Sequence, residues 1–123
     1  MPQKKIILID DDPDLLEVTR RRLEHEGYGV MTSNDSMAGL KLAIENKPDL
    51  IVMDIKMPKM DGWSLVRKLR TDVRTKEIPI IVLTGYEDMQ DLFIAEGIYD
   101  YLMKPYHPEK LLGLIIKCFD GSE

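Results

Sequence analysis

The chain has 123 residues, of which 17 are basic, 22 are acidic and 44% are hydrophobic, as expected for one domain with one ordinary core. The net charge of −5 argues against nucleic acid as a direct ligand, because phosphate binding needs a basic face. No apolar stretch is long enough to cross a membrane, and one cysteine cannot form a disulfide within the chain. We therefore expect a cytoplasmic protein without membrane insertion.

Five short apolar runs, rich in isoleucine, leucine and valine, alternate with longer amphipathic stretches. These runs predict β-strands at about Lys5–Ile9, Tyr28–Thr32, Leu50–Met53, Ile80–Leu83 and Tyr101–Met103. The first, third and fourth runs are almost purely apolar, which is typical of parallel strands that are covered on both faces.

The amphipathic stretches predict five helices, which begin at about Asp12–Pro13, Ser36, Asp61–Gly62, Asp88 and His107–Pro108. Asp12 followed by Pro13 indicates an N-cap with proline in the first turn, and this helix should end near Gly27. The fourth helix is short, at about Asp88–Glu96. The side chains expected to face the sheet are Leu15, Leu16, Thr19 and Leu23, then Leu40, Ala43 and Ile44, then Leu65, Val66 and Leu69, and finally Leu111, Leu112, Ile115, Ile116 and Phe119.

Five β–α units joined by short loops predict an α/β protein, in which a doubly wound five-stranded parallel sheet lies between two layers of helices. The expected strand order of this three-layer sandwich is 2-1-3-4-5, the flavodoxin-like order. We expect a single domain over residues 1–119, with a tail or the start of a linker at residues 120–123.

Polar residues follow four of the five apolar runs. Asp10 and Asp11 follow the first run, Asp54 the third, Thr84 the fourth and Lys104 the fifth. In an open parallel sheet the carboxyl ends of the strands share one edge, and ligands bind there. The spacing therefore predicts one acidic cleft with a lysine, which can hold Mg²⁺ and accept a phosphoryl group.

Four short sequences, LIDDDP, VMDIKMPKMDG, VLTGY and YLMKPY, follow one another along the chain. With all four in this order and spacing, nearly the whole chain resembles the receiver domain of response regulators in bacterial two-component systems. In that phosphorelay family a histidine kinase donates a phosphoryl group to an aspartate, and the altered surface controls an output. The resemblance implies a phosphoprotein that is not an enzyme beyond autocatalysed phosphoryl acceptance and self-dephosphorylation.

The resemblance also implies the partners of the chain. One is a sensor histidine kinase or a phosphotransfer protein, which would supply the phosphoryl group. The other is a downstream output protein or an output domain that would follow the present C-terminus.

The same resemblance implies a role for each matching acidic residue. Asp54 would be the phosphoacceptor, while Asp10 and Asp11 would form the acidic pair beside it. These three carboxylates would hold Mg²⁺, or Mn²⁺, together with the backbone carbonyl of Lys56. Mg²⁺ suits the task because it binds oxygen ligands and keeps some of its waters.

Three further residues match the family at the remaining positions. Lys104 and the Thr84 hydroxyl would contact the phosphoryl group, and Thr84 with Tyr101 would form the switch. Tyr101 is equally compatible with a core aromatic. The tight turn that aims Lys104 into the cleft predicts a cis Lys104–Pro105 bond.

Two other functions fit part of this pattern. A Mg²⁺-dependent phosphohydrolase would also form an aspartyl-phosphate, but such enzymes generally place a second acid two residues after the nucleophile, where this chain has Lys56. A pure interaction module could keep the fold without phosphorylation, but it would not need the complete acidic set. We therefore favour the phosphoacceptor.

Overall fold

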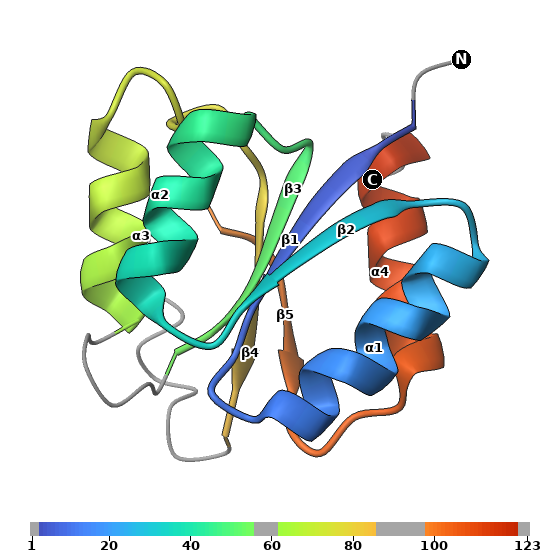
Figure 1. Cartoon of the computed structure of the whole chain (residues 1–123). Helices are drawn as coiled ribbons and strands as arrows, with labels where there is room; N and C mark the ends of the chain where they lie inside the picture. The colour runs from blue at the N-terminus through green and yellow to red at the C-terminus, as the bar shows by residue number, and fades with distance from the viewer. Residues whose placement is uncertain (1–2, 56–61, 86–97, 121–123) are drawn as a thin grey trace.

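The computed structural model describes residues 3–55, 62–85 and 98–120 (Figure 1). The described residues form one parallel sheet of five strands in the order 2-1-3-4-5, as the sequence predicts. The strands are β1 (Lys5–Ile9), β2 (Gly29–Ser33), β3 (Leu50–Asp54), β4 (Ile80–Thr84) and β5 (Ile98–Met103).

Helices cover the sheet on its two faces, so the predicted three-layer sandwich is confirmed (Figure 1). Helices α2 (Ser36–Asn46) and α3 (Gly62–Thr71) lie on one face, and α1 (Pro13–His25) and α4 (Pro108–Asp120) lie on the other. The predicted helix at Asp88–Glu96 falls outside the described residues. None of the described helices has the length and apolar character needed to span a bilayer.

Alternate side chains of the central strands enter two separate cores. In β1, Ile7 and Ile9 pack on the side of α2 and α3, whereas Ile6 and Leu8 pack on the side of α1 and α4. All four side chains are at most 3% exposed. Because successive side chains of a strand point to opposite faces, a strand that is covered on both faces must be apolar throughout.

Several strand boundaries differ from the prediction. Strand β2 lies one residue later than Tyr28–Thr32, and β5 begins three residues before Tyr101. Strands β3 and β4 each extend by one polar residue, Asp54 and Thr84. The ladder is made by backbone groups, so it continues past the last apolar side chain.

The first helix begins and ends as the sequence predicts. The Asp12 side chain accepts hydrogen bonds from the backbone N–H groups of Asp14 at 3.1 Å and Leu15 at 3.2 Å, which makes it the N-cap. The helix ends at His25, and Gly27 then takes a φ of +100°, a conformation that favours glycine. Asp12 thus fixes the start of α1 directly after the acidic pair.

Most side chains that were expected to face the sheet are buried or half-buried, but Ile116 is not. Leu111 and Ile115, one helical turn apart in α4, are fully buried. Ile116 is 43% exposed, so its predicted inward position is wrong. It follows Ile115 by one residue, about 100° around the helix, and this rotation carries it off the buried face.

Helix α3 begins in close contact with the residue that follows β3. The Gly62 N–H donates to the Ile55 carbonyl at 2.7 Å. A Cβ on Gly62 would lie 2.3 Å from that carbonyl oxygen, so a larger residue would push the helix away. The predicted first residue of the helix, Asp61, lies outside the described part of the chain.

Candidate functional site

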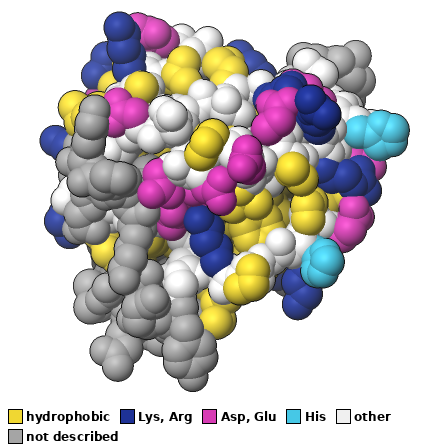
Figure 2. Space-filling model, turned by 60° about the horizontal axis from the view of Figure 1, so that its bottom comes forward, with side chains coloured by type: hydrophobic (Ala, Val, Ile, Leu, Met, Phe, Trp, Pro, Cys, Tyr) yellow, Lys and Arg dark blue, Asp and Glu magenta, His cyan; other side chains and the backbone are white. Residues whose placement is uncertain are grey.

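The strand register brings the predicted carboxylates to one edge of the sheet. Ile9 in β1 pairs with Met53 in β3, so the residues that follow them, Asp10 and Asp54, are neighbours. One carboxylate oxygen from each of Asp10, Asp11 and Asp54 lies within 4.8 Å of the others. Figure 2 looks toward this edge and shows acidic side chains gathered near the middle of the face, next to a basic one.

Lys104 joins two of these carboxylates. Its Nζ lies 2.9 Å from Oδ2 of Asp10 and donates to Oδ2 of Asp54 at 3.1 Å. Lys104 follows directly after β5, and its backbone N–H donates to the Thr84 carbonyl at 2.8 Å. The Lys104–Pro105 bond is cis, which confirms that prediction. The lysine therefore reaches past β4 to the acids of β1 and β3.

Burial and charge shift the protonation of this cluster. Asp10 is only 2% exposed, and this burial raises the pKa of its carboxyl above the ordinary value, although Lys104 and the Asp12 N–H act in the opposite direction. Burial alone would lower the pKa of Lys104, but its hydrogen bonds and ion pairs with Asp10 and Asp54 raise it above the ordinary value. Lys104 is therefore a cation at neutral pH, beside the three acidic residues of the cluster.

The donor atoms of the cluster suit a hard divalent cation. All three side chains offer carboxylate oxygens, the ligands that Mg²⁺ and Mn²⁺ prefer over nitrogen and sulfur. Asp11 is exposed, whereas Asp10 and Asp54 are buried, so the cluster opens to solvent on one side. The Lys56 carbonyl, which was expected as a further ligand, lies outside the described residues.

Thr84 ends β4, the strand between β3 and β5. Its side chain is fully buried, and its hydroxyl donates to the Gly85 carbonyl at 3.0 Å. The same residue pairs with Met103, directly before Lys104. Thr84 thus lies at the same edge as the acidic cluster, with its hydroxyl engaged by the loop that follows the strand.

Tyr101 lies within β5, where it pairs with Val82. It is 43% exposed, so the alternative that it is a core aromatic is wrong. Strand β5 is the last of the sheet, which leaves part of the ring uncovered by the described residues. Its assignment as a switch residue stays a prediction.

Sequence reasoning missed Tyr106 as a neighbour of the site. Tyr106 lines a small cavity with Asp10 and Thr19, between α1 and the sheet. Thr19 was expected to face the sheet, but no role near the acids was assigned to it. The available signal was a hydroxyl residue on the otherwise apolar inward face of α1.

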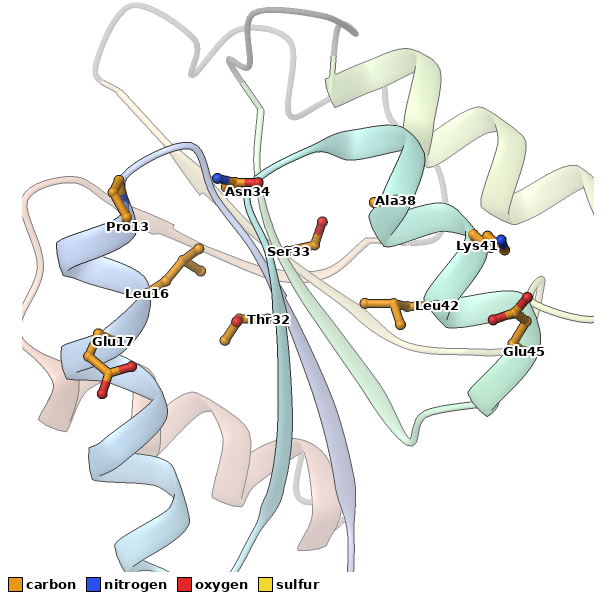
Figure 3. Close-up of a pocket in the computed structure, with 10 residues that line it drawn as sticks. All are labelled: Pro13, Leu16, Glu17, Thr32, Ser33, Asn34, Ala38, Lys41, Leu42 and Glu45. Carbon is orange, nitrogen blue, oxygen red and sulfur yellow. The ribbon is translucent and has the colours of Figure 1, made fainter.

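A larger groove of about 590 Å³ lies beside β2, between α1 and α2 (Figure 3). Figure 3 shows Leu16 and Glu17 on one wall, Leu42 on the other, and Thr32 and Ser33 from β2 between them. The site carboxylates and Lys104 do not line it. This groove and the acidic cluster are therefore separate places.

Known proteins are similar in sequence to this chain over most of its length. The family model described as "Response regulator receiver domain" matches residues 6–116. Over 113 residues the chain is 38% identical to the DNA-binding dual master transcriptional regulator RpaA of Synechocystis sp., with 90% of this chain and 47% of RpaA covered. Over 122 residues it is 36% identical to the alkaline phosphatase synthesis transcriptional regulatory protein PhoP of Bacillus subtilis, with 98% and 50% covered. The chain spans about half the length of these relatives.

Solved structures agree with the fold. A response regulator receiver domain protein from Clostridium thermocellum has a TM-score of 0.87 and 32% identity, with 96% of this chain and 95% of that chain covered. The chemotaxis response regulator CheY4 of Vibrio cholerae has a TM-score of 0.86 and 28% identity, with 95% and 99% covered. Sheet order, acidic cluster and family match together show that this chain belongs to the response regulator receiver domains.

Proposed function

We propose that this receiver domain accepts a phosphoryl group on Asp54 in a reaction that depends on Mg²⁺, and that the phosphorylated form controls a partner. One observation carries the proposal. The carboxylates of Asp10, Asp11 and Asp54 meet within 4.8 Å, and the Lys104 ammonium lies within 3.1 Å of Asp10 and Asp54. Such a set neutralises the charge of a phosphoryl group in transit.

The proposed metal ligands are the carboxylates of Asp10, Asp11 and Asp54 and the Lys56 backbone carbonyl. When bound, Mg²⁺ or Mn²⁺ neutralises charge on the phosphoryl oxygens and lets neighbouring carboxylates stay ionised together. The buried Asp10 and the exposed Asp11 approach the cluster from different depths. Asp54, which is 6% exposed, has a second oxygen for the chemical step.

In that step, a carboxylate oxygen of Asp54 attacks the phosphorus atom of the donor. An oxygen–phosphorus bond forms as the bond between phosphorus and the donor histidine nitrogen breaks, and this nitrogen keeps the electron pair. Lys104, already 3.1 Å from Asp54 Oδ2, pairs with a phosphoryl oxygen. The chain contributes mainly positioning and electrostatic stabilisation.

Thr84 and Tyr101 are the proposed switch. In the present structure the Thr84 hydroxyl donates to the Gly85 carbonyl, and a phosphoryl group on Asp54 offers a more highly charged acceptor at the same edge. Movement of Thr84 would shift β4 against β5, where Tyr101 is half exposed. The phosphoryl group biases two existing states by its different contacts in each.

The proposed phosphoryl donor is a sensor histidine kinase or a phosphotransfer protein in the cytoplasm. The proposed recipient of the signal is an output protein or an output domain. The relatives support this reading, because RpaA and PhoP are named as transcriptional regulators and this chain matches about half of each.

Incubation with acetyl phosphate and Mg²⁺, followed by intact mass measurement, tests the function. The wild-type protein should gain the mass of one phosphoryl group, and Asp54→Asn should gain none. Label that maps to Asp10, Asp11 or another residue would contradict the assignment of Asp54. Rapid turnover of added phosphate esters would instead indicate a phosphohydrolase, and no label under any condition would indicate an interaction module.

A further inference from the structure

A small cavity lies beside Asp10 of the acidic cluster, between α1 and the sheet. Three polar side chains, Asp10, Thr19 and Tyr106, line it among apolar residues such as Leu16 and Val52. The space open to the centre of a water-sized molecule is about 10 Å³, close to the ~10–15 Å³ that one water needs. The cavity is thus large enough for one small polar guest and is partly polar.

Two atoms of this cavity are buried with unused hydrogen-bonding capacity. Thr19 is 2% exposed, and its Oγ1 has no hydrogen-bond partner of good geometry. Asp10 Oδ2 is also buried; its partner is Lys104 Nζ at 2.9 Å, and a carboxylate oxygen with one such partner can accept a further hydrogen bond. Buried polar groups are nearly always satisfied by protein or by ordered water, so the Thr19 hydroxyl points to a bound molecule, and Asp10 Oδ2 could accept from it.

Tyr106 supplies a donor next to these atoms. Its ring packs against the core on the α1 side of the sheet. Burial raises the pKa of its hydroxyl above the ordinary value, and the Thr19 hydroxyl, which approaches it closely enough for a weak hydrogen bond, opposes this shift only in part. The tyrosine therefore keeps its proton near neutral pH, and a neutral phenol can both donate and accept.

We propose that Tyr106 and Thr19 are positioning residues for Asp10, and that they act by holding one water molecule beside its carboxylate. The water donates to Asp10 Oδ2 and to Thr19 Oγ1, and it accepts from the Tyr106 hydroxyl. Three hydrogen bonds are typical of a buried structural water. The cavity is thereby assigned as a site for a single ordered water.

This water would fix the orientation of Asp10. The other oxygen, Oδ1, already accepts from the Asp12 N–H at 3.1 Å. With both oxygens hydrogen-bonded, rotation of the Asp10 carboxylate beside Asp11 and Asp54 would be restricted. The effect on metal binding rests on the proposed function, because it requires Asp10 to be a ligand of Mg²⁺. The water site itself does not depend on that role.

The water can be observed without metal. A high-resolution crystal structure of the metal-free protein should show density for one water within hydrogen-bonding distance of all three side chains. Thr19→Val keeps the shape of the side chain and removes its hydroxyl, so the water should be lost or weakly occupied. A cavity that is empty in the wild-type crystal would overturn the proposal, whatever the protein does with Mg²⁺.

The positioning role is tested by calorimetric titration with Mg²⁺. Tyr106→Phe and Thr19→Val should each weaken Mg²⁺ binding by up to about tenfold, the lower end of the range for residues that support a ligand. The double variant should bind no more weakly than either single variant, because both hydroxyls hold the same water. Tyr28→Phe, which removes a hydroxyl from a ring that contacts Phe119, is the matched control and should bind like wild type.

The possible results separate the two proposals. If wild type shows no Mg²⁺ binding, the proposed function fails, whereas the crystallographic test of the water still stands. If wild type binds Mg²⁺ but both single variants bind it equally well, the positioning role is wrong. Additive losses in the double variant would also overturn it, since independent packing defects add. Thermal unfolding of each variant confirms that the comparison is made between folded proteins.

Discussion

Lys104 Nζ lies 2.9 Å from Asp10 Oδ2, although these residues come from strands at different positions in the sheet, with β3 and β4 between them. The same ammonium lies 3.1 Å from Asp54 Oδ2. In the metal-free protein, Lys104 is thus a positive charge that stabilises two buried carboxylates. A bound cation would stabilise the same carboxylates. The metal is therefore expected to contribute less to stability when Lys104 is present than when it is absent.

Replacing Lys104 with methionine should therefore destabilise the metal-free protein and strengthen its response to Mg²⁺. Loss of the hydrogen bond from Lys104 to the charged Asp54 costs about 1.5–3 kcal/mol, so a loss of about 2 kcal/mol in the free energy of unfolding is expected. The measurement is thermal unfolding with and without Mg²⁺. Lys110→Met, at an exposed position of α4, is the control. A smaller Mg²⁺-induced rise in Tm for Lys104→Met than for wild type would contradict the idea.

Asp11→Ala should have the opposite effect on the metal-free protein. Asp11 is exposed and adds a third carboxylate to a crowded cluster, and like charges at short range repel. Its removal should raise Tm without metal and abolish the increase caused by Mg²⁺. Glu45→Ala, which removes an exposed acid from α2, should leave that increase intact. A Mg²⁺ response that survives in Asp11→Ala would argue against a metal site formed by these residues.

Asp10 should make the free energy of unfolding depend on pH, and a mutation of Asp10 can isolate this contribution. Burial raises its pKa in the folded protein above the ordinary value of 3.8, so the folded state holds this proton more tightly than the unfolded state. Stability from Asp10 is then greatest below pH 3.8 and is lost as pH rises through the folded-state pKa. The Asp10→Asn variant has no titratable group at this position, so its stability lacks this dependence on pH.

The stability difference, Asp10→Asn minus wild type, should accordingly increase from acid pH upward and then level off. Urea unfolding at a series of pH values in the presence of a chelator measures it. A constant difference would mean that the pKa of Asp10 is the same in the folded and unfolded states, and a difference that shrinks with increasing pH would mean that the native site favours ionised Asp10; either result would contradict the prediction.

Thr84→Ala should separate phosphoryl binding from the switch. The variant keeps the acidic cluster and Lys104 and loses the hydroxyl that is proposed to move toward the phosphoryl group. With beryllofluoride and Mg²⁺, NMR shifts in wild type should extend to Tyr101 in β5, whereas in Thr84→Ala they should stay near Asp54. Thr84→Ser, which keeps the hydroxyl, should behave like wild type. Full propagation to Tyr101 in the alanine variant would exclude Thr84 as the coupling residue.

Much of the fold could be predicted because local sequence patterns determine where its strands and helices begin and end. Apolar runs fix the strands, Asp12 and Pro13 fix the start of α1, and the strand ends bring Asp10, Asp54 and Lys104 to one edge. These features depend on periodicity and on the order of elements, which a single sequence displays.

Other features depend on what lies next to a residue in space. The ladder extends to Asp54 and Thr84 because backbone pairing ignores side-chain polarity. Ile116 is exposed because α4 buries a narrower face than its apolar residues would allow. The cavity beside Asp10 is lined by residues of α1 and by Tyr106 in the loop after β5. These segments are far apart in the chain, so no local sequence pattern predicts that they meet.

In the proposed switch, the hydrogen bond from Thr84 Oγ1 to the Gly85 carbonyl must break before the hydroxyl can reach the phosphoryl group. A neutral hydrogen bond contributes about 1 kcal/mol, and one to a charged acceptor about 1.5–3 kcal/mol. If the hydroxyl exchanges the first for the second, the net gain is roughly 0.5–2 kcal/mol, or about 2- to 30-fold in population. If Thr84 is the switch as proposed, so small a margin makes the response graded: phosphorylation gives a large active population only where some unphosphorylated molecules already occupy the signalling state.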